Sequence, residues 1–453
     1  MSLIVVSNRE PLQEENGSWQ PSVGGLTTAL LPVLEKRGGV WVAWGEEKAD
    51  EVPSIQYPED DPILEVKRLK LTDEEIGNYY YGLANRVLWP VCHYFIEQMD
   101  LQQQFFDDYA EVNRRFADAV ADTYNEGDAV WIQDYHLLLA PGFVRERVPD
   151  ARIGFFFHIP WPAVEVWRTL PWSKELTKGL LGADLLGFHN DAYAGNFLDA
   201  AKDVGATVEG NCVYYEGRTI RAEAHPIGID TARFESFADK ESVQKGAEEL
   251  KASIHSEYII VGVDRLDYTK GLPERLLAFE HFLEHNPDYQ GKVTLYQVAS
   301  PSRTRVESYQ ELKRTVDEIA GRINGAYMQG DWVPVRYLYR SFPQEELASV
   351  YLAADAALIT PIRDGMNVVA QEFSLITESG TLILSNLTGA ADVLTETLRV
   401  NPFDIEEVSA AIKEALTTPE EKRRERAAKL REQVKSLDVH GWAEGFLNSL
   451  EER

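Results

Sequence analysis

The sequence has few of the features that mark secreted, multi-cysteine metal-binding or membrane proteins. Its 453 residues include only two cysteines, Cys92 and Cys212, too few for a disulfide scaffold or a multi-cysteine zinc site. No apolar run approaches the roughly 18 residues that a membrane helix needs. No basic leader precedes the first apolar residues, so a secretory signal is not expected. These absences predict a cytoplasmic chain without a membrane segment.

Positive charge is also scarce. The chain has 45 Lys and Arg against 74 Asp and Glu, which gives a formal net charge of −29. Because nucleic-acid affinity depends on clustered cations, such a surface would repel a phosphate backbone, and a nucleic-acid partner is not expected. Hydrophobic residues make up 44% of the chain and aromatic residues 11%. This is enough for a packed core in each of two or three domains of roughly 150 residues.

Short apolar runs alternate with helical periodicity along most of the chain, a pattern typical of parallel sheets covered by helices. Strands are expected at 3–7, 40–44, 129–133, 152–157, 184–188, 258–263, 292–298, 356–359 and 381–384, and helices at 25–35, 105–124, 273–284 and 406–437. We therefore expect an α/β fold of two Rossmann-like domains, 1–229 and 230–435, facing across a ligand cleft. Residues 436–453 are expected to form a helix that crosses back to the first domain.

Two cations stand in a loop directly after a predicted strand of the second half. Arg265 and Lys270 are five residues apart in the segment R-L-D-Y-T-K. An arginine can clamp a diphosphate with two hydrogen bonds, and a lysine can add a point charge. The alternative interpretation is a structural pair of Arg265 and Asp267 beside a solvated Lys270.

A second loop, from Thr360 to Glu372, also follows a predicted strand. Gly365 permits an unusual backbone there, and the amides after it point from the amino end of a helix, where anions bind. Asp364 can accept hydrogen bonds from sugar hydroxyls, and Glu372 can accept those of a ribose. The alternative is that Asp364 caps the helix and Glu372 lies on its surface.

Polar residues end three predicted strands of the first half, where an α/β sheet places its ligands. They are Arg9, Asp134 and His158. Asp134 can orient a hydroxyl, and His158 fits either a substrate contact or a structural role. Gly24 and Gly25 either let the backbone approach a ligand closely or form a plain turn.

Taken together, these segments resemble the trehalose-6-phosphate synthases, retaining glycosyltransferases of the two-Rossmann-domain GT-B class. The similarity covers nearly the whole chain and depends on motifs in a fixed order. They are S-N-R-x-P at Ser7, G-G-L at Gly24, Y-x-x-x-x-N-x-x-L-W-P at Tyr80, D-Y-H at Asp134, H-I-P-x-P at His158, D-L-L-G-F at Asp184, R-L-D-Y-x-K-G-L at Arg265, P-S-R ending at Arg303, and T-P-I-R-D-G-M-N-V-V-A-x-E at Thr360.

The resemblance implies a role for each matching residue. The implied donor-binding residues are Gly25, Arg265, Lys270, Asp364, Met366, Asn367, Val368, Val369 and Glu372. The implied acceptor-binding residues are Arg9, Tyr80, Trp89, Asp134 and Arg303. The implied catalytic set is Arg265, Lys270, His158 and Asp364. In this scheme the two cations hold the donor diphosphate, Glu372 binds the ribose, and the side chains of Asp364 and His158 surround the donor glucose.

The resemblance also implies a reaction. Glucose would pass from a nucleotide-glucose, expected to be UDP-glucose, to glucose 6-phosphate with retention, giving trehalose 6-phosphate on the way to an osmolyte. No cofactor or metal is required in this scheme, and Mg²⁺ is at most a stimulant. A separate phosphatase is expected downstream. The nucleobase preference and the formation of a homo-oligomer stay open.

Some residues depart from the family pattern. Trp161 stands where phenylalanine is usual. The segments around Trp161 and Trp172 resemble those of glucosylglycerol-phosphate synthases, whose acceptor is glycerol 3-phosphate. The alternatives are therefore a different acceptor or a nucleotide-sugar sensor without catalysis. Arg265, Lys270 and Asp364 are all present, whereas a sensor of this kind would be expected to lose them.

The charge balance predicts a salt dependence. Only 17 of the 45 cations are lysines, and the acidic residues are spread along the chain. Because salt screens self-repulsion within about 3 Å at 1 M, we expect the thermal midpoint to rise from low to molar KCl. Thermal melts across that range measure it, and an unchanged or falling midpoint would indicate an ordinary acidic enzyme instead.

Overall fold

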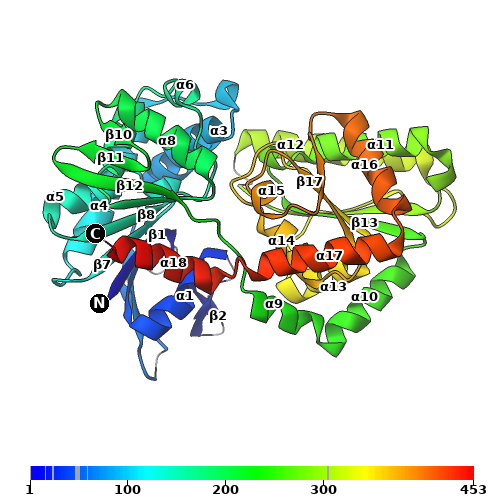
Figure 1. Cartoon of the computed structure of the whole chain (residues 1–453), viewed down its shortest axis with the longest axis horizontal. Helices are drawn as coiled ribbons and strands as arrows, with labels where there is room; N and C mark the ends of the chain where they lie inside the picture. The colour runs from blue at the N-terminus through cyan, green and yellow to red at the C-terminus, as the bar shows by residue number, and fades with distance from the viewer. Residues whose placement is uncertain are drawn as a thin grey trace. The chain divides into compact units, whose positions relative to one another are not determined.

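The computed structural model describes residues 2–15, 17–22, 25–45, 52–58, 60–303 and 306–452. The chain forms two compact units (Figure 1). Unit 1 consists of Met1–Ile227 with Val439–Arg453, and unit 2 consists of Gly228–Asp438. The last helix, α18 (Val439–Glu451), therefore belongs to unit 1 although it follows unit 2 in the sequence.

Unit 1 is built on a ten-stranded sheet in the order β10-β11-β12-β9-β8-β7-β1-β4-β6-β5. The strands from β12 to β6 run parallel, whereas β5, β10 and β11 pair antiparallel at the two ends. Their bounds are β1 (Leu3–Arg9), β4 (Gly39–Trp44), β5 (Ser54–Tyr57), β6 (Leu64–Leu69), β7 (Ala129–Gln133), β8 (Arg152–Phe156), β9 (Leu185–Phe188), β10 (Thr207–Glu209), β11 (Cys212–Tyr215) and β12 (Arg218–Ala224). The expected parallel strands are confirmed, and the antiparallel ends are an addition to them.

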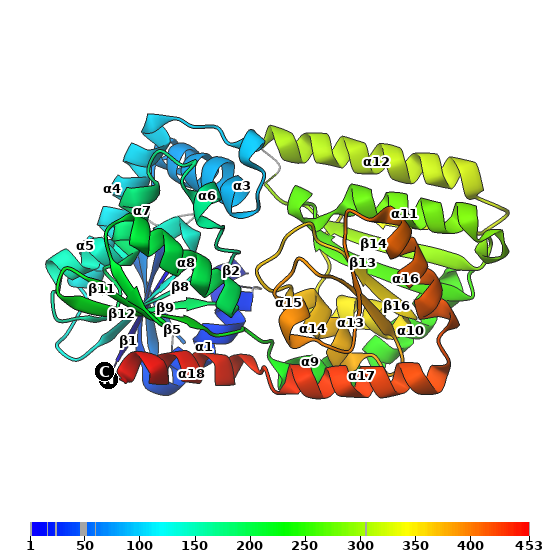
Figure 2. The ribbon, with the colours of Figure 1, turned by 45° about the horizontal axis from the view of Figure 1, so that its top comes forward.

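Helices cover both faces of this sheet (Figure 2). The π-helical segment η1 (Ile76–Leu88) and the helices α4 (Gln103–Ala121) and α5 (Ala140–Arg147) lie on one face. Helix α1 (Gly25–Arg37) and α18 lie on the other. The apolar run at the start of β1 is buried along its length, as a parallel strand between two helix layers requires.

Helix α18 approaches the sheet at two glycines. A Cβ atom added to Gly154 of β8 or to Gly187 of β9 would stand 2.7 Å from the ring of Phe446. The same ring stacks on Trp131 of β7, with 4.6 Å between centroids. Because neither glycine has a side chain, Phe446 packs directly against β8 and β9. This contact fixes α18 on the sheet of unit 1.

Unit 2 contains a six-stranded sheet that is parallel throughout, in the order β15-β14-β13-β16-β17-β18. The strands are β13 (Tyr258–Arg265), β14 (Val293–Ser300), β15 (Val335–Leu338), β16 (Ala356–Ile359), β17 (Thr381–Ser385) and β18 (Leu398–Val400). The helices on one face are α11 (Leu272–His285), α12 (Glu307–Tyr327) and α16 (Ile405–Thr417). Those on the other are α9 (Thr231–Ala238), α10 (Glu241–Ser253), α13 (Gln344–Ala353), α14 (Val368–Ile376) and α17 (Glu420–Lys435) (Figure 2). This arrangement confirms the predicted second parallel sheet.

The remaining elements are a hairpin and further helices. They are the hairpin β2 (Leu12–Glu15) and β3 (Ser18–Pro21), and α2 (Asp73–Glu75), α3 (Trp89–Cys92), η2 (Ile96–Gln98), η3 (Tyr135–Leu137), α6 (Val164–Trp167), α7 (Ser173–Leu180), α8 (Asp191–Asp203), η4 (Tyr268–Lys270), η5 (Pro287–Tyr289) and α15 (Ala390–Val393). Of these, α8 packs on β9 and β12. Among the described residues, no helix combines the length and the apolar character needed to span a membrane.

The packing of α18 predicts a stability effect. Phe446→Ala should lower the free energy of unfolding by about 3–5 kcal/mol, because it leaves a cavity between the helix and the two glycines. Chemical denaturation measures it. Asn448→Ala, at an exposed position of the same helix, is the matched control and should change stability by less than about 0.5 kcal/mol. Equal effects of the two variants would contradict this packing.

Candidate active site

The carboxyl ends of neighbouring strands bring the predicted donor residues of unit 2 together. Strand β13 ends at Arg265, β14 ends shortly before Arg303, and β16 ends before the loop that holds Asp364. Because β14, β13 and β16 are parallel neighbours, these three segments meet at one edge of the sheet. The residues come from loops that are far apart in the sequence.

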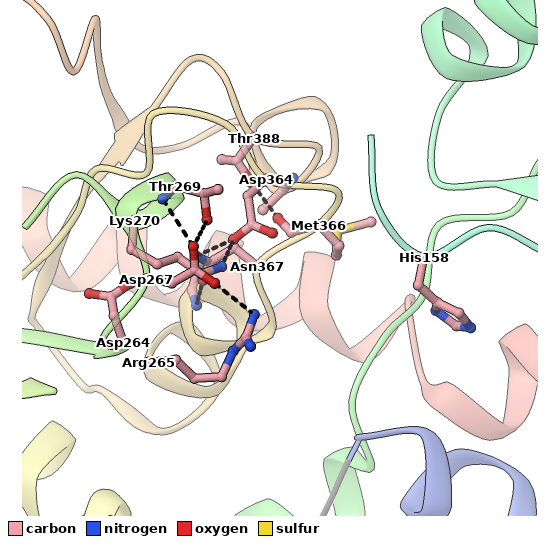
Figure 3. A network of polar contacts seen from close by, with 12 residues as sticks. His158, Asp264, Arg265, Asp267, Thr269, Lys270, Asp364, Met366, Asn367 and Thr388 are labelled. Carbon is pink, nitrogen blue, oxygen red and sulfur yellow. Dashed lines mark hydrogen bonds and ion pairs between the residues drawn. The ribbon is translucent and has the colours of Figure 1, made fainter. Parts of the chain in front are cut away.

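Asp267 is the buried centre of the first cluster (Figure 3). Its Oδ1 accepts hydrogen bonds from the Thr269 amide at 3.1 Å and from the Thr269 hydroxyl at 3.0 Å. Its Oδ2 accepts from Arg303 Nη1 at 3.1 Å and from the Tyr309 hydroxyl at 3.0 Å, and Arg265 Nη2 lies 3.7 Å away. Burial acts to raise the pKa of Asp267, but the three nearby cations Arg303, Arg265 and Lys270, with the Thr269 amide, outweigh it and lower the pKa to about 2.

Lys270 belongs to a second cluster. Its Nζ lies 2.5 Å from Oδ2 of Asp364, and that oxygen also accepts a hydrogen bond from Asn367 Nδ2 at 3.0 Å (Figure 3). The Lys270 side chain is only 12% exposed. The alternative interpretation of a solvated Lys270 is therefore wrong, whereas the expected proximity of Arg265 and Asp267 is present in the structure.

Asn367, and not Asp364, caps helix α14. Its backbone has a positive φ of 88°, and its Oδ1 accepts a hydrogen bond from the Ala370 amide at 3.1 Å. The alternative in which Asp364 caps the helix is therefore wrong, and the Asp364 carboxylate is left to pair with Lys270. Val368 and Val369 are the first two residues of α14, where backbone N–H groups lack partners within the helix.

The two loops are fastened to one another. The Thr269 carbonyl accepts a hydrogen bond from the Ile362 amide at 2.8 Å. Gly271 has a φ of +66°, and a Cβ atom there would stand 2.5 Å from the Thr360 carbonyl oxygen. Only glycine allows both this backbone and this approach. The carbonyl of Met366, a buried residue, accepts from the Thr388 hydroxyl and from the Ala390 amide, which ties the far end of the loop to the segment after β17.

A buried arginine, Arg275, donates hydrogen bonds to both of these loops. Arg275 pairs with Asp264 and donates hydrogen bonds to Gln297 Oε1 at 3.0 Å, to the Thr360 hydroxyl at 3.2 Å and to the Lys270 carbonyl at 3.3 Å. Burial raises the pKa of Asp264, and its ion pair with Arg275 opposes that rise. The pair thus fixes both the Lys270 loop and the start of the Asp364 loop.

Glu372 is buried in α14. Its Oε2 accepts a hydrogen bond from the Tyr351 hydroxyl at 3.0 Å. Burial raises the pKa of Glu372 to about 7, although the hydrogen bond from Tyr351 acts in the other direction. The alternative that placed Glu372 on the helix surface is wrong.

A cavity of about 310 Å³ opens beside these clusters. Its lining residues are Ser302, Tyr309, Gln310, Lys313, Arg314 and Tyr339. It adjoins the Asp267 cluster, because Tyr309 belongs to both and Arg265 Nη1 lies 3.4 Å from the Ser302 hydroxyl. Its lining combines aromatic rings with cations, and Lys313 Nζ lies 4.8 Å from the centre of the Tyr339 ring.

Unit 1 gathers its predicted residues in the same way. Strands β1, β7 and β8 are parallel neighbours that end at, or one or two residues before, Arg9, Asp134 and His158. Asp134 has a positive φ of 71°, a strained backbone of the kind found at functional sites, and its Oδ1 accepts from the His158 amide at 3.1 Å. Gln133 Oε1 lies 2.9 Å from His158 Nε2. Burial, followed by the charge of His189, lowers the pKa of His158 well below its ordinary value. This lowered pKa favours the neutral imidazole of His158 at neutral pH.

The other predicted residues of unit 1 are aromatic or glycine. Arg9 Nη2 donates to the Tyr80 hydroxyl at 3.3 Å, and Tyr80 stacks on His136. Trp89 is the buried first residue of α3. Gly25 begins α1, and Gly24 lies outside the described residues. Within the described ranges, no group of three or more His, Cys, Asp or Glu side chains is arranged to hold a metal ion.

Comparison with known proteins identifies the family. The model of glycosyltransferase family 20 matches residues 1–452. The chain belongs to glycosyltransferase family 20. A trehalose-6-phosphate synthase of Mycobacterium avium is 41% identical over 99% of this chain and 95% of its own length. A solved Escherichia coli structure bound with UDP-2-fluoro glucose has a TM-score of 0.93 at 35% identity, covering 100% of this chain and 99% of its own. A Burkholderia xenovorans structure in complex with glucose-6-phosphate has a TM-score of 0.90 at 33% identity, covering 100% of both chains. The predicted resemblance and the GT-B fold class are confirmed.

Several residues of this family 20 site are not found by sequence reasoning. Tyr309, Tyr351, Arg275 and Gln133 hold the predicted side chains. Arg275 and Gln133 stand in segments predicted only as a helix and a strand, and Tyr309 and Tyr351 stand where no element is predicted. Asp267 is the exception, because it lies inside the Arg265 motif and is already noted there as the partner of Arg265. The signal for the others is three-dimensional, since each acts on a residue from another element.

Burial of Glu372 predicts a pH dependence of stability. Its folded pKa of about 7 lies above the ordinary value of 4.5, so the folded chain holds this proton more tightly than the unfolded chain does. The contribution of Glu372 to stability should therefore fall as the pH rises from about 4.5 through 7. Glu372→Gln removes this titration, and its thermal midpoint relative to wild type should be higher at pH 8 than at pH 5.

The control is Glu378→Gln, which changes an exposed carboxyl just after α14 and should give the same difference from wild type at both pH values. A Glu372→Gln difference that stays constant with pH would contradict the raised pKa.

Proposed function

We propose that this chain transfers glucose from UDP-glucose to glucose 6-phosphate with retention, forming trehalose 6-phosphate and UDP. The bond between the glucose C1 and the diphosphate oxygen breaks, and a bond from C1 to the acceptor hydroxyl oxygen forms. The hydroxyl proton passes to the departing phosphate on the same face of the sugar, and no protein nucleophile is used. The observation that carries this proposal is the cluster of Arg265, Lys270 and the amino end of α14 at one sheet edge in a chain of charge −29.

The residues proposed to bind the nucleotide-sugar donor belong mainly to unit 2. Arg265 and Lys270 stabilise the charge that develops on the departing diphosphate, together with the amides of Val368 and Val369. Glu372 is proposed to bind the ribose, and the cavity beside Arg265 has the size and the aromatic lining to accept a nucleoside. Asp364, held next to Lys270, is proposed to accept a hydroxyl of the donor glucose, with Met366 and Asn367 in the same loop.

The remaining roles follow from the resemblance. Arg9, Tyr80 and Trp89 are proposed for the acceptor phosphate, with Arg303. Asp134 is proposed to accept an acceptor hydroxyl, a contact that glycerol 3-phosphate lacks the ring to make. Because His158 is neutral, it can hydrogen-bond a hydroxyl of the donor glucose without adding charge, and Gly25 is proposed to approach the donor through its backbone.

No resident cofactor takes part in the proposed reaction, and Mg²⁺ is at most a stimulant. The product keeps its phosphate, so a hydrolytic step has to release the neutral disaccharide osmolyte, and a separate phosphatase is proposed for that step. The work of the chain is positioning and electrostatic stabilisation of the departing group.

Product analysis of the purified chain tests the proposal. We expect trehalose 6-phosphate from UDP-glucose and glucose 6-phosphate, and much slower reaction with glycerol 3-phosphate or free glucose. Arg265→Ala and Lys270→Ala should each lower turnover by roughly 10²–10³-fold, because each removes a charge that stabilises the departing diphosphate. Lys251→Ala, at an exposed position of α10, is the control for loss of a cation and should react like wild type.

Each other outcome is decisive. Equal or faster reaction with glycerol 3-phosphate would identify glycerol 3-phosphate as the acceptor. Efficient use of free glucose would show that the acceptor phosphate is not required. Binding of the nucleotide sugar without product would indicate a sensor. Near-normal turnover in both cation variants would overturn the assignment of the donor site.

A further inference from the structure

One carboxylate oxygen in unit 2 serves two arginines that have different proposed ligands. Oδ2 of Asp267 lies 3.1 Å from Arg303 Nη1 and 3.7 Å from Arg265 Nη2. Arg265 is assigned to the donor diphosphate and Arg303 to the acceptor phosphate. The side chain of Asp267 has no exposed surface, so a ligand cannot reach it directly.

We propose that Asp267 is a positioning residue that aims both Arg265 and Arg303 at the phosphates of the two substrates. The inference rests on the proposed function and goes beyond it, because it assigns a shared role to a residue that touches neither substrate. Asp267 acts through the two guanidinium groups.

The geometry around Arg303 supports this role. Its Nη1 donates to Oδ2 of Asp267 and to the Tyr309 hydroxyl, and the Tyr309 hydroxyl donates to the same Oδ2. A guanidinium carries its five donors in one fixed plane, so two contacts on one nitrogen set the direction of the others. The backbone of Arg303 also has a positive φ of 43°, a conformation that the surrounding contacts must hold.

The carboxylate itself is rigid and permanently charged. Oδ1 is held by the amide and the hydroxyl of Thr269 in the same loop. With a pKa of about 2, Asp267 stays ionised throughout the neutral range. It therefore offsets the mutual repulsion of Arg265, Arg303 and Lys270, which would otherwise drive these cations apart before a substrate arrives.

Asp264 provides a matched comparison. Its side chain is also buried, it lies near the end of β13 three residues before Asp267, and it pairs with a buried arginine, Arg275. It contacts neither Arg265 nor Arg303 in any described hydrogen bond or ion pair. Loss of its charge should lower stability as much as loss of the Asp267 charge does, without acting through the phosphate-binding arginines.

The test is a double-mutant cycle. Asp267→Asn keeps the shape but removes the charge, and it should raise KM for both UDP-glucose and glucose 6-phosphate by about tenfold. In an Arg303→Ala background the same substitution should no longer change KM for glucose 6-phosphate, and in an Arg265→Ala background it should no longer change KM for UDP-glucose. Asp264→Asn should lower the thermal midpoint to a similar extent, and its effect on KM for glucose 6-phosphate should be additive with Arg303→Ala. Additive effects of Asp267→Asn in both backgrounds would overturn the proposal and leave Asp267 a structural residue.

Two further measurements keep the proposal open to refutation. If Asp267→Asn does not fold, Tyr309→Phe removes only the hydroxyl that links Arg303 to Asp267, and it should raise KM for glucose 6-phosphate more than KM for UDP-glucose; equal changes would overturn the proposal.

Binding of inorganic pyrophosphate, measured by calorimetry, needs no turnover. It should weaken about tenfold in Asp267→Asn and should be insensitive to that change in an Arg265→Ala background. If Asp267→Asn loses pyrophosphate binding as expected but the wild-type chain transfers no sugar, only the proposed function is refuted. If Asp267→Asn binds pyrophosphate as the wild type does while the wild type transfers sugar normally, only the role of Asp267 is refuted.

Discussion

The site of unit 2 depends on the pairing of cations with buried or mostly buried carboxylates. A chain of charge −29 has to concentrate positive charge at one sheet edge, and it does so in three pairs: Arg275 with Asp264, Arg303 with Asp267, and Lys270 with Asp364. Removing a charge from water is costly unless a partner and further hydrogen bonds compensate it. Asp267 and Asp364 each accept hydrogen bonds beyond their ion pair, and in the first pair the further hydrogen bonds are those that Arg275 donates to Gln297, Thr360 and Lys270. The loops between the pairs take their shape from these contacts, so the electrostatics of the site and its geometry have the same origin.

Parallel strand pairing supplies the second constraint. In each unit, neighbouring parallel strands deliver their following loops to one edge, which is why Arg9, Asp134 and His158 gather in unit 1 and Arg265, Arg303 and Asp364 in unit 2. Glycines then decide how closely the layers approach. Gly154 and Gly187 admit Phe446 of α18, and Gly271 admits the Thr360 carbonyl. The function of the chain thus begins with backbone arrangements that the apolar strands already determine.

The same physics explains what the sequence could and could not predict. Strands 129–133 and 356–359 match the structure residue for residue, because short β-rich apolar runs are typical of buried strands. The strands β10 and β11 are only three and four residues long and are partly exposed, so neither forms the longer apolar run of a buried strand. The residues at the strand ends are predictable by type, but apart from Asp267 beside Arg265 their partners are not. Lys270 pairs with a carboxylate 94 positions away. Asn367 caps α14 because its backbone has a positive φ, which no sequence pattern reveals. Position along the chain predicts elements well, whereas the charge state and partner of a side chain depend on packing.

Pairing Lys270 with Asp364 also bears on how a donor would bind in the proposed function. Because Lys270 is mostly buried and already paired, part of the cost of removing its charge from water is met before any ligand arrives. A diphosphate next to Lys270 would draw the ammonium from Asp364, and the carboxylate would then need another hydrogen-bond donor. A sugar hydroxyl one group away from the diphosphate supplies that donor. Asn367, which already donates to Asp364 and caps α14, would hold the carboxylate in place during the exchange. The ion pair therefore favours a ligand that presents an anion and a hydroxyl together over one that presents either alone.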